Sequence, residues 1–194
     1  DTHDVTEIDK VLVISALSFD LTQKNLIGLL LRGGQVHLFP GSYDPEQIRK
    51  TILRCKITML NAVSCVVYPI LEDSRDPEEL MSLRIIMIGG ELVVTSRLKK
   101  VLEYKLPCCL INSYGPTEGS DIATTYHLTK SDIESQKRVI PIGKPIPNTE
   151  VYILDKHHQL VPVGVEGELC IGGVGVARGY LNSSELTAEK FIYH

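Results

Sequence analysis

Residues 83–90 carry the sequence LRIIMIGG, an apolar run of strand length that ends at two glycines. Apart from Arg84, every residue before the glycines is apolar, so the run lacks the alternation of a strand with one face in water. Such runs are typical of strands buried on both faces, which occur in parallel sheets covered by helices. The stretch therefore predicts an interior strand of an α/β fold.

The sequence on both sides of this strand repeats the pattern. We expect further strands at 11–16, 36–39, 57–60 and 108–112, and helices at 21–31, at 45–54, at 64–72 with an interruption near Pro69, and at 95–104 with Thr95 as cap. The helix at 45–54 has the clearest start, because Asp44 precedes a proline at the first helical position. Strands that alternate with helices imply parallel pairing through right-handed crossovers. We therefore predict an α/β fold with a flavodoxin-like parallel sheet and helices on both faces.

The pattern changes after residue 120. Residues 121–128 read as a strand, 129–138 as a polar loop, 151–155 and 167–172 as two strands separated by a turn region, and 184–191 as an amphipathic helix. Because no helix separates the last two strands, they indicate part of an antiparallel β subdomain. We therefore expect one domain at 1–140 and the start of a second at 141–194.

Composition excludes some classes of function. The formal net charge is −4 and the basic residues are scattered, so we expect a small-molecule or protein partner, with no nucleic acid and no membrane. The 5 cysteines lack zinc-like spacing and mostly lie in apolar stretches, which favours buried reduced thiols over disulfides. The first twenty residues do not read as a signal peptide, and no apolar run approaches about 20 residues. We expect a cytoplasmic protein.

Residues 112–119, with the sequence NSYGPTEG, carry the most chemistry and directly follow an expected buried strand. In an open parallel sheet, ligands bind beyond the carboxyl ends of the strands. Tyr114 can stack on a base, and Asn112 can hydrogen-bond a base edge. Thr117 and nearby N–H groups can meet a phosphate, and Glu118 can hold magnesium. Taken alone, the stretch is also compatible with an ordinary loop that turns at its Gly-Pro pair.

Residues 114–118 (YGPTE) are similar to a core motif of adenylate-forming enzymes. Other stretches resemble segments of the same family in the family's order: 18–20 (SFD) before a helix, 88–91 (IGGE), 139–145 (VIPIGKP), and 167–173 (GELCIGG) with 177–181 (ARGYL). The resemblance covers essentially all 194 residues. The chain thus resembles an adenylation domain of nonribosomal peptide synthetases, in the ANL adenylate-forming superfamily, and within it an internal fragment of the large N-terminal core.

The resemblance implies an ATP-dependent ligase of antibiotic or secondary-metabolite biosynthesis. Such an enzyme joins an amino-acid carboxylate to the α-phosphate of ATP, releases pyrophosphate, and passes the acyl group to the phosphopantetheine thiol of a carrier-protein domain. Thr117 and Glu118 match catalytic positions, and Glu118 also matches the Mg²⁺ ligand. The implied ATP/AMP-binding residues are Gly89, Gly90, Glu91, Asn112, Ser113, Tyr114, Gly115 and Thr117. Residues 1–140 would bind substrate and adenine, and 141–194 would begin a truncated β-barrel-like subdomain.

Three parts of the family's catalytic machinery are expected outside this chain. They are a phosphate loop upstream of residue 1, a Thr-Gly-Asp motif beyond His194, and a mobile C-terminal domain with a catalytic lysine. Two of them would stabilise charge on the ATP phosphates or the adenylate, which is usually the largest catalytic contribution. We therefore expect the chain alone to be inactive and the remaining adenylation subdomains of the parent to be its partners.

The same motifs imply the substrate pocket. The matching positions are Asp20, Leu21, Lys24, Asn61, Met87, Gly89, Ser113, Asp121 and Ile122. Asp20 suits a cationic α-amino group, although an aspartate here also suits a helix N-cap. Lys24 either pairs with Asp20 or Asp121, or answers an acidic or amide substrate, or is a solvated surface lysine. The set favours a polar substrate side chain without specifying the amino acid.

Two other interpretations stay open. An acyl-CoA or aryl-acid ligase belongs to the same superfamily, but its substrate has no ammonium group for Asp20 to bind. Alternatively, the chain is a noncatalytic excised subdomain that retains only ligand binding, which is a different class of function. ATP/pyrophosphate exchange by the parent protein with amino, fatty and aryl acids distinguishes the first alternative from amino-acid activation. Calorimetry with amino acid and with AMP tests whether the chain itself is only a weakly binding module.

Overall fold

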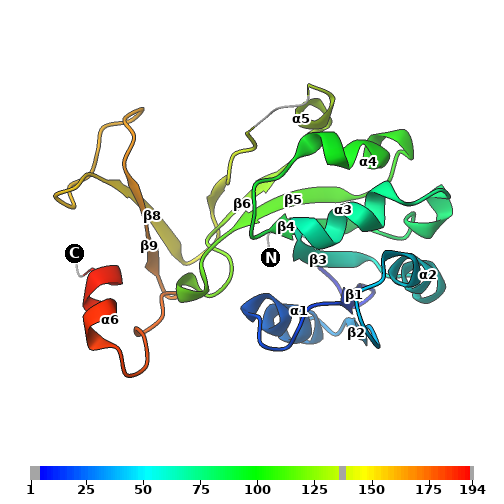
Figure 1. The fold of residues 1–194 in the computed structure, drawn as a ribbon, viewed down its shortest axis with the longest axis horizontal. Coiled ribbons are helices and arrows are strands. Elements are labelled where there is room, and N and C mark those ends of the chain that lie inside the picture. Colours follow the sequence, from blue (N-terminus) through cyan, green and yellow to red (C-terminus); the bar gives the residue numbers. More distant parts are fainter. Residues whose placement is uncertain (1–4, 136–138, 193–194) are drawn as a thin grey trace. The chain divides into compact units, whose positions relative to one another are not determined.

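A seven-stranded sheet organises the first part of the chain in the computed structural model, which describes residues 5–135 and 139–192 (Figure 1). Its strands are β1 (Lys10–Val13), β2 (Gln35–Leu38), β3 (Met59–Val63), β4 (Ile85–Gly89), β5 (Cys109–Tyr114), β6 (Thr124–His127) and β7 (Lys144–Pro145). Their order is β2-β1-β3-β4-β5-β6-β7, with parallel pairs from β2 to β5 and β6 antiparallel to β5. The order β2-β1-β3-β4-β5 is the flavodoxin-like one, so the predicted fold class is confirmed.

Helices pack on both faces of this sheet, as predicted. They are α1 (Asp20–Leu30), α2 (Pro45–Cys55), α3 (Ser64–Glu72), α4 (Lys99–Glu103) and α5 (Lys130–Glu134), with 3-10 turns η1 (Pro77–Glu79) and η2 (Thr95–Leu98). Leu12 of β1 belongs to the larger core cluster, which includes residues of α2, α3 and α4. Its neighbours Val11 and Val13 belong to a smaller cluster with Leu29 of α1. The division follows because successive side chains of a strand point to opposite faces.

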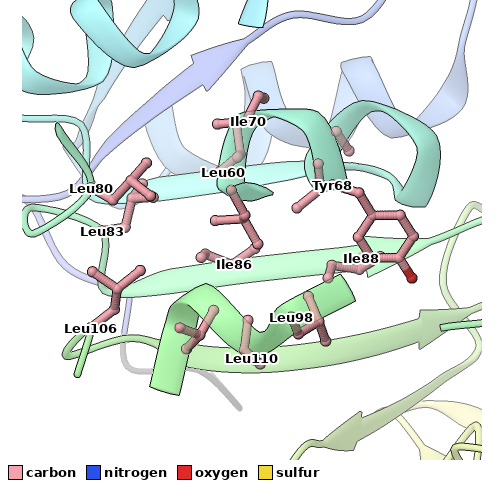
Figure 2. Packing of buried hydrophobic residues seen from close by; sticks show 14 of the residues in the cluster. Leu60, Tyr68, Ile70, Leu80, Leu83, Ile86, Ile88, Leu98, Leu106 and Leu110 are labelled. Carbon is pink, nitrogen blue, oxygen red and sulfur yellow. The ribbon is translucent and has the colours of Figure 1, made fainter. Parts of the chain in front are cut away.

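The larger cluster holds the central strands together. Figure 2 shows Leu60 of β3, Ile86 of β4 and Ile70 of α3 within it, and all three are 0% exposed. Burying each such side chain contributes about 1.5–3 kcal/mol. The packing fixes β3 and β4 side by side, and their carboxyl ends therefore lie at the same edge of the sheet.

Helix α2 begins as its sequence predicts. The Asp44 carboxylate accepts hydrogen bonds from the backbone N–H groups of Glu46 and Gln47, at 2.9 and 3.2 Å. Both Ile48 and Ile52 are 0% exposed and face the core. Two N–H groups of the first turn are thereby satisfied, which fixes where the helix starts.

Two helix predictions were wrong in detail. Helix α3 runs through Pro69 without interruption, because the proline removes only one helical hydrogen bond, the one to the carbonyl of Cys65, which is an exposed residue. Thr95 does not cap a helix: it is a buried residue inside η2, and the N-cap position is Val94. The expected helix at 95–104 is therefore a 3-10 turn followed by α4.

Other bounds also differ from the predictions. The strand expected at 11–16 ends at Val13. The one expected at 121–128 begins at Thr124, because Asp121 has a left-handed backbone.

Residues 130–134 form α5 where a loop is expected, because Thr129 and Asp132 each accept the other's backbone N–H in a capping box. The rest of that expected loop, 136–138, lies outside the described residues. Strand β3 extends through Asn61, which pairs in register with Met87, although this polar residue ends the apolar run at 57–60.

The chain forms two compact units. One contains the described residues up to Tyr114 together with Thr124–Lys144. The other contains Gly115–Ala123 and the described residues from Pro145 onward, with η3 (Thr117–Gly119), β8 (Thr149–Leu154), β9 (Glu168–Gly173) and α6 (Ser184–Lys190). Strands β8 and β9 are antiparallel, as predicted, with Val151 opposite Ile171.

The cysteines differ from one another in exposure. All five thiols are free, as predicted, but Cys65 and Cys109 are exposed where burial is expected. Burial raises the pKa of Cys108 to about 12, so this thiol stays protonated at neutral pH. Among residues 5–135 and 139–192, no helix combines the length and apolar character needed to span a membrane.

Candidate functional site

The carboxyl ends of β4 and β5 approach each other closely at Gly89. This residue pairs in register with Ser113, and a Cβ added to it would lie 2.6 Å from Ser113 Oγ. The Ser113 hydroxyl donates a hydrogen bond to the Ile88 carbonyl at 3.3 Å. Gly90, which follows, has a φ of +78°, a left-handed conformation that favours glycine. Sheet packing thus accounts for Gly89 and the left-handed backbone for Gly90, and their contact with a nucleotide stays a prediction.

Asn112 and Tyr114 end β5 in different environments. The Asn112 side chain is buried and its amide donates to the Pro141 carbonyl at 2.8 Å. This contact uses one of the two N–H groups of the carboxamide, and the role of Asn112 at a base edge also stays a prediction. The Tyr114 side chain is 40% exposed at the end of the strand. Its ring is therefore accessible to a planar ligand, which is what stacking on a base requires.

The Gly-Pro-Thr-Glu turn belongs to the second unit and is tightly folded. A Cβ at Gly115 would lie 2.5 Å from the Asp121 carbonyl oxygen, so only glycine fits there. The turn continues as η3, and Ser120 and Asp121 follow it with φ of 61° and 73°. The Ile122 N–H then donates to the Ser120 carbonyl at 3.0 Å. Thr117 is exposed on this turn, where its hydroxyl can reach a ligand.

Glu118 is held by a segment about 60 residues further along the chain. Its carboxylate Oε1 accepts a hydrogen bond from the Tyr180 hydroxyl, and its backbone carbonyl accepts the Ala177 N–H at 2.7 Å. The hydrogen bond to Glu118 raises the pKa of Tyr180 above its ordinary value, with smaller contributions from desolvation and the carboxylate charge. Tyr180 therefore stays a hydrogen-bond donor at neutral pH.

Glu118 fits a Mg²⁺ site of the kind completed by a nucleotide. Within residues 5–135 and 139–192, no group of three or more His, Cys, Asp or Glu side chains is arranged to hold a metal. Mg²⁺ differs from structural metals, since one or two carboxylates usually bind it together with phosphate oxygens and water. A single carboxylate beside the exposed Thr117 is consistent with that chemistry.

Helix α1 begins at Asp20 and not after it. The N-cap residue is Phe19, and the Asp20 carboxylate accepts the neighbouring Leu21 N–H at 2.8 Å. The alternative role of Asp20 as an N-cap is therefore wrong, because Asp20 itself has helical geometry. Its side chain is partly exposed. A carboxylate in this setting remains accessible to a cationic ligand.

A cavity of about 220 Å³ lies between α1 and the strands β1, β3 and β4. Three of the predicted pocket residues line it: Lys24, Asn61 and Met87. Its lining does not include the other four predicted residues of this unit, Asp20, Leu21, Gly89 and Ser113. Asp121 and Ile122 belong to the second unit, and their place in the pocket stays a prediction.

Lys24 lies beside the thioether of Met87. The two side chains approach to 3.9 Å, between Nζ and Sδ. Lys24 is partly buried, so it is not the fully solvated surface lysine of one alternative. Lys24 lines the cavity between the helix and the sheet.

Two asparagines hold each other in a fixed orientation next to Lys24. Asn25 Nδ2 donates to the backbone carbonyl of Asn61 at 3.2 Å, which leaves Asn25 Oδ1 to accept from Asn61 Nδ2 at 2.7 Å. This arrangement determines which way the Asn61 carboxamide faces. Its Oδ1 is buried and has no hydrogen-bond donor among the described residues. Buried acceptors without a partner are costly, which makes this oxygen a candidate ligand contact.

Family comparison identifies the chain. A family model described as AMP-binding enzyme matches residues 1–181. The chain belongs to the AMP-binding enzyme family.

Relatives of this AMP-binding chain include large synthetases. Tyrocidine synthase 3 of Brevibacillus parabrevis is 36% identical over 187 residues, which cover 94% of this chain and 3% of that protein. The chain therefore spans a small fraction of the length of the curated relatives it matches.

Solved structures of synthetases share the fold. The nonribosomal peptide synthetase FmoA3, in its alpha-methyl-L-serine-AMP bound form, has a TM-score of 0.90 and 28% sequence identity over 98% of this chain and 22% of that one. Holo-PA1221, an NRPS protein containing adenylation and PCP domains, has a TM-score of 0.87 and 30% identity over 97% and 32%. The predicted resemblance to adenylation domains of nonribosomal peptide synthetases is confirmed.

Asn25 and Tyr180 of this AMP-binding chain were missed as candidate site residues. Asn25 had a detectable signal, because it lies on the face of α1 that buries Thr22 and Leu29. A polar residue on such a face needs a partner, and that partner is Asn61. Tyr180 lies in the stretch 177–181 that resembles a family segment, but that resemblance did not reveal its contact with Glu118, which is 62 positions earlier in the sequence.

Proposed function

We propose that the chain is part of an adenylation domain that activates an amino acid as its aminoacyl adenylate within a nonribosomal peptide synthetase. The observation that carries the proposal is its fold match, with a TM-score of 0.90 over 98% of the chain, to a synthetase bound to an aminoacyl-AMP. Placement of Tyr114 at the exposed end of β5, directly before the Gly-Pro-Thr-Glu turn, supports it. The reaction joins the substrate carboxylate to the α-phosphorus of ATP and releases pyrophosphate.

The proposed amino-acid site divides into two parts. Asp20 binds the α-ammonium group, because its carboxylate is partly exposed at the start of α1. The substrate side chain enters the cavity beside Lys24, Asn61 and Met87. A polar side chain with a hydrogen-bond donor suits the buried Asn61 Oδ1, which has no donor within the described residues. Leu21, Gly89, Ser113, Asp121 and Ile122 complete the proposed substrate contacts.

The proposed nucleotide site follows the ends of β4 and β5. Tyr114 stacks on the adenine, and Thr117 contacts the phosphates. Further contacts come from Gly89, Gly90, Glu91, Asn112, Ser113 and Gly115. Glu118 holds Mg²⁺, which neutralises charge on the phosphates when it is bound. Asp20 lies in the first unit and the Glu118 turn in the second.

The remaining proposals concern the parent protein. The acyl group passes from the adenylate to the phosphopantetheine thiol of a carrier domain in the cytoplasm. Residues 1–140 serve as the substrate- and adenine-binding part, and 141–194 begin a β-barrel-like part. The chain alone is inactive, because charge stabilisation on the ATP phosphates comes in part from segments outside it.

Pyrophosphate exchange by the full-length protein tests this function. We expect exchange that depends on one or a few polar amino acids and not on aryl or fatty acids. Asp20→Asn removes the charge that binds the ammonium group, so it should abolish most of the exchange. The control Asp155→Asn, in the turn after β8, should leave exchange unchanged. Exchange with aryl or fatty acids but no amino acid would overturn the proposal.

A further inference from the structure

Within the second unit, residues 173–180 form hydrogen bonds with the Gly-Pro-Thr-Glu turn and the residues that follow it. The Ala177 N–H donates to the Glu118 carbonyl at 2.7 Å, and Ser120 Oγ donates to the Gly175 carbonyl at 2.6 Å. These bonds hold the turn at the Glu118 carbonyl and at Ser120, two residues later. The turn is therefore held by protein contacts before any ligand binds.

Tyr180 contacts the side chain of Glu118. Its hydroxyl donates to Glu118 Oε1. Tyr180 is itself anchored from its other side, since its N–H donates to Thr187 Oγ1 at 2.9 Å and its ring meets Phe191 edge-on at 5.6 Å between centroids. The phenol is therefore a fixed donor, and one carboxylate oxygen of Glu118 is fixed with it.

We propose that Tyr180 is a positioning residue for magnesium–nucleotide binding, because it holds the Glu118 carboxylate in the orientation in which it meets the metal. The inference rests on the proposed function. A glutamate side chain loses rotational freedom when it binds a ligand, and a side chain that is already fixed loses less. Tyr180 therefore strengthens the metal-dependent part of ATP binding without touching the nucleotide.

A matched control lies in the same unit. Tyr152 also donates its hydroxyl to a glutamate, Glu150 Oε2, at 2.7 Å. Removing that hydroxyl deletes the same kind of bond at a position with no proposed role in binding. Tyr152→Phe thus separates a general loss of one phenol–carboxylate bond from an effect on Glu118.

Calorimetric titration of ATP into the full-length protein, with Mg²⁺ and with EDTA, tests the inference. Tyr180→Phe should weaken ATP binding in Mg²⁺ by about tenfold, the size expected for one hydrogen bond to a charged group. It should leave binding in EDTA and the amino-acid KM unchanged. Tyr152→Phe should change none of these values. An unchanged ratio of Mg²⁺ to EDTA affinity in Tyr180→Phe would overturn the inference.

A double-mutant cycle keeps the test decisive if Tyr180→Phe also loosens the fold. In a Glu118→Gln background, Tyr180→Phe should have no further effect on the Mg²⁺-dependent ratio, because the charge it orients is gone. Equal effects of Tyr180→Phe in both backgrounds would contradict the positioning role. Absence of Mg²⁺-dependent ATP binding in the unsubstituted protein would instead refute the proposed nucleotide site and, with it, this inference.

Discussion

Two polar clusters in the same sheet, each around one buried side chain, differ in whether the hydrogen bonds of that side chain are complete. Asp9, Thr58 and Arg84 immediately precede β1, β3 and β4, and they join the amino ends of these three strands. The Asp9 side chain is 0% exposed, and both of its oxygens accept hydrogen bonds. Asn61, inside β3, keeps one buried oxygen without a donor among the described residues. The first cluster satisfies its buried carboxylate within the fold, whereas the second leaves a buried acceptor for which we propose a ligand contact.

The largest effect should come from breaking the Asp9 cluster. Asp9→Ala removes the carboxylate that accepts from Arg84 Nε and Nη2 at 3.1 and 2.8 Å. Breaking a buried ion pair costs about 3–5 kcal/mol, and the partial exposure of Arg84 favours the lower end, about 3 kcal/mol. Urea denaturation measures this change. A loss below about 1 kcal/mol, the range of a surface pair, would contradict the structural role.

The Asp9 cluster should also make the stability of the protein depend on pH in the acid range. Burial alone would raise the pKa of Asp9, but hydrogen bonds from Arg84, Thr6 and Thr58 outweigh it and hold the pKa at about 2. Because the folded pKa lies below the ordinary 3.8, the stabilisation is present above that value and is lost as pH falls toward 2. The shift corresponds to about 2 kcal/mol. In denaturation curves over this range, Asp9→Asn should lack this part of the pH dependence; an unchanged slope would refute it.

Breaking the Asn25–Asn61 pair should raise the KM for the amino acid and lower the free energy of unfolding only slightly. Asn25→Ala removes both hydrogen bonds between the two asparagines, including the one that orients the Asn61 carboxamide, so the free energy of unfolding should fall by about 1–2 kcal/mol. The amino-acid KM should rise by about threefold to tenfold, because Asn61 Oδ1 is no longer held in place. Pyrophosphate exchange by the full-length protein measures the KM. Gln23→Ala, exposed on the same helix, serves as control, and a KM unchanged in Asn25→Ala would count against the ligand role.

The sequence predicted the strands and helices of the sheet better than it predicted the Asp9 cluster and the Asn25–Asn61 pair. The apolar run before Gly89 identified β4, and Asp44 with its following proline identified the start of α2, because both signals are local. Pairing between distant positions could not be read from the sequence: Asp9 meets Arg84 across 75 positions, and Glu118 meets Tyr180 across 62, although the latter two lie in recognisable motifs. Candidate residues Lys24, Asn61 and Met87 came together at a cavity. Their shared surface depends on strand register, which a list of motifs does not contain.

The smallest effect should come from a pair with the same chemistry as Asp9 but near the surface. Arg97 donates to both Glu72 oxygens, at 2.8 and 2.5 Å, while both side chains are about 40% exposed (42% and 35%). The hydrogen bond from Arg97 lowers the pKa of Glu72, but solvent screens the pair. Glu72→Gln should therefore cost about 0.5 kcal/mol, and less in high salt. Arg97 also keeps its contact with the Tyr68 ring, 4.5 Å from the centroid, in that variant. If urea denaturation gave Glu72→Gln a cost as large as that of Asp9→Ala, burial would not be what separates the two pairs.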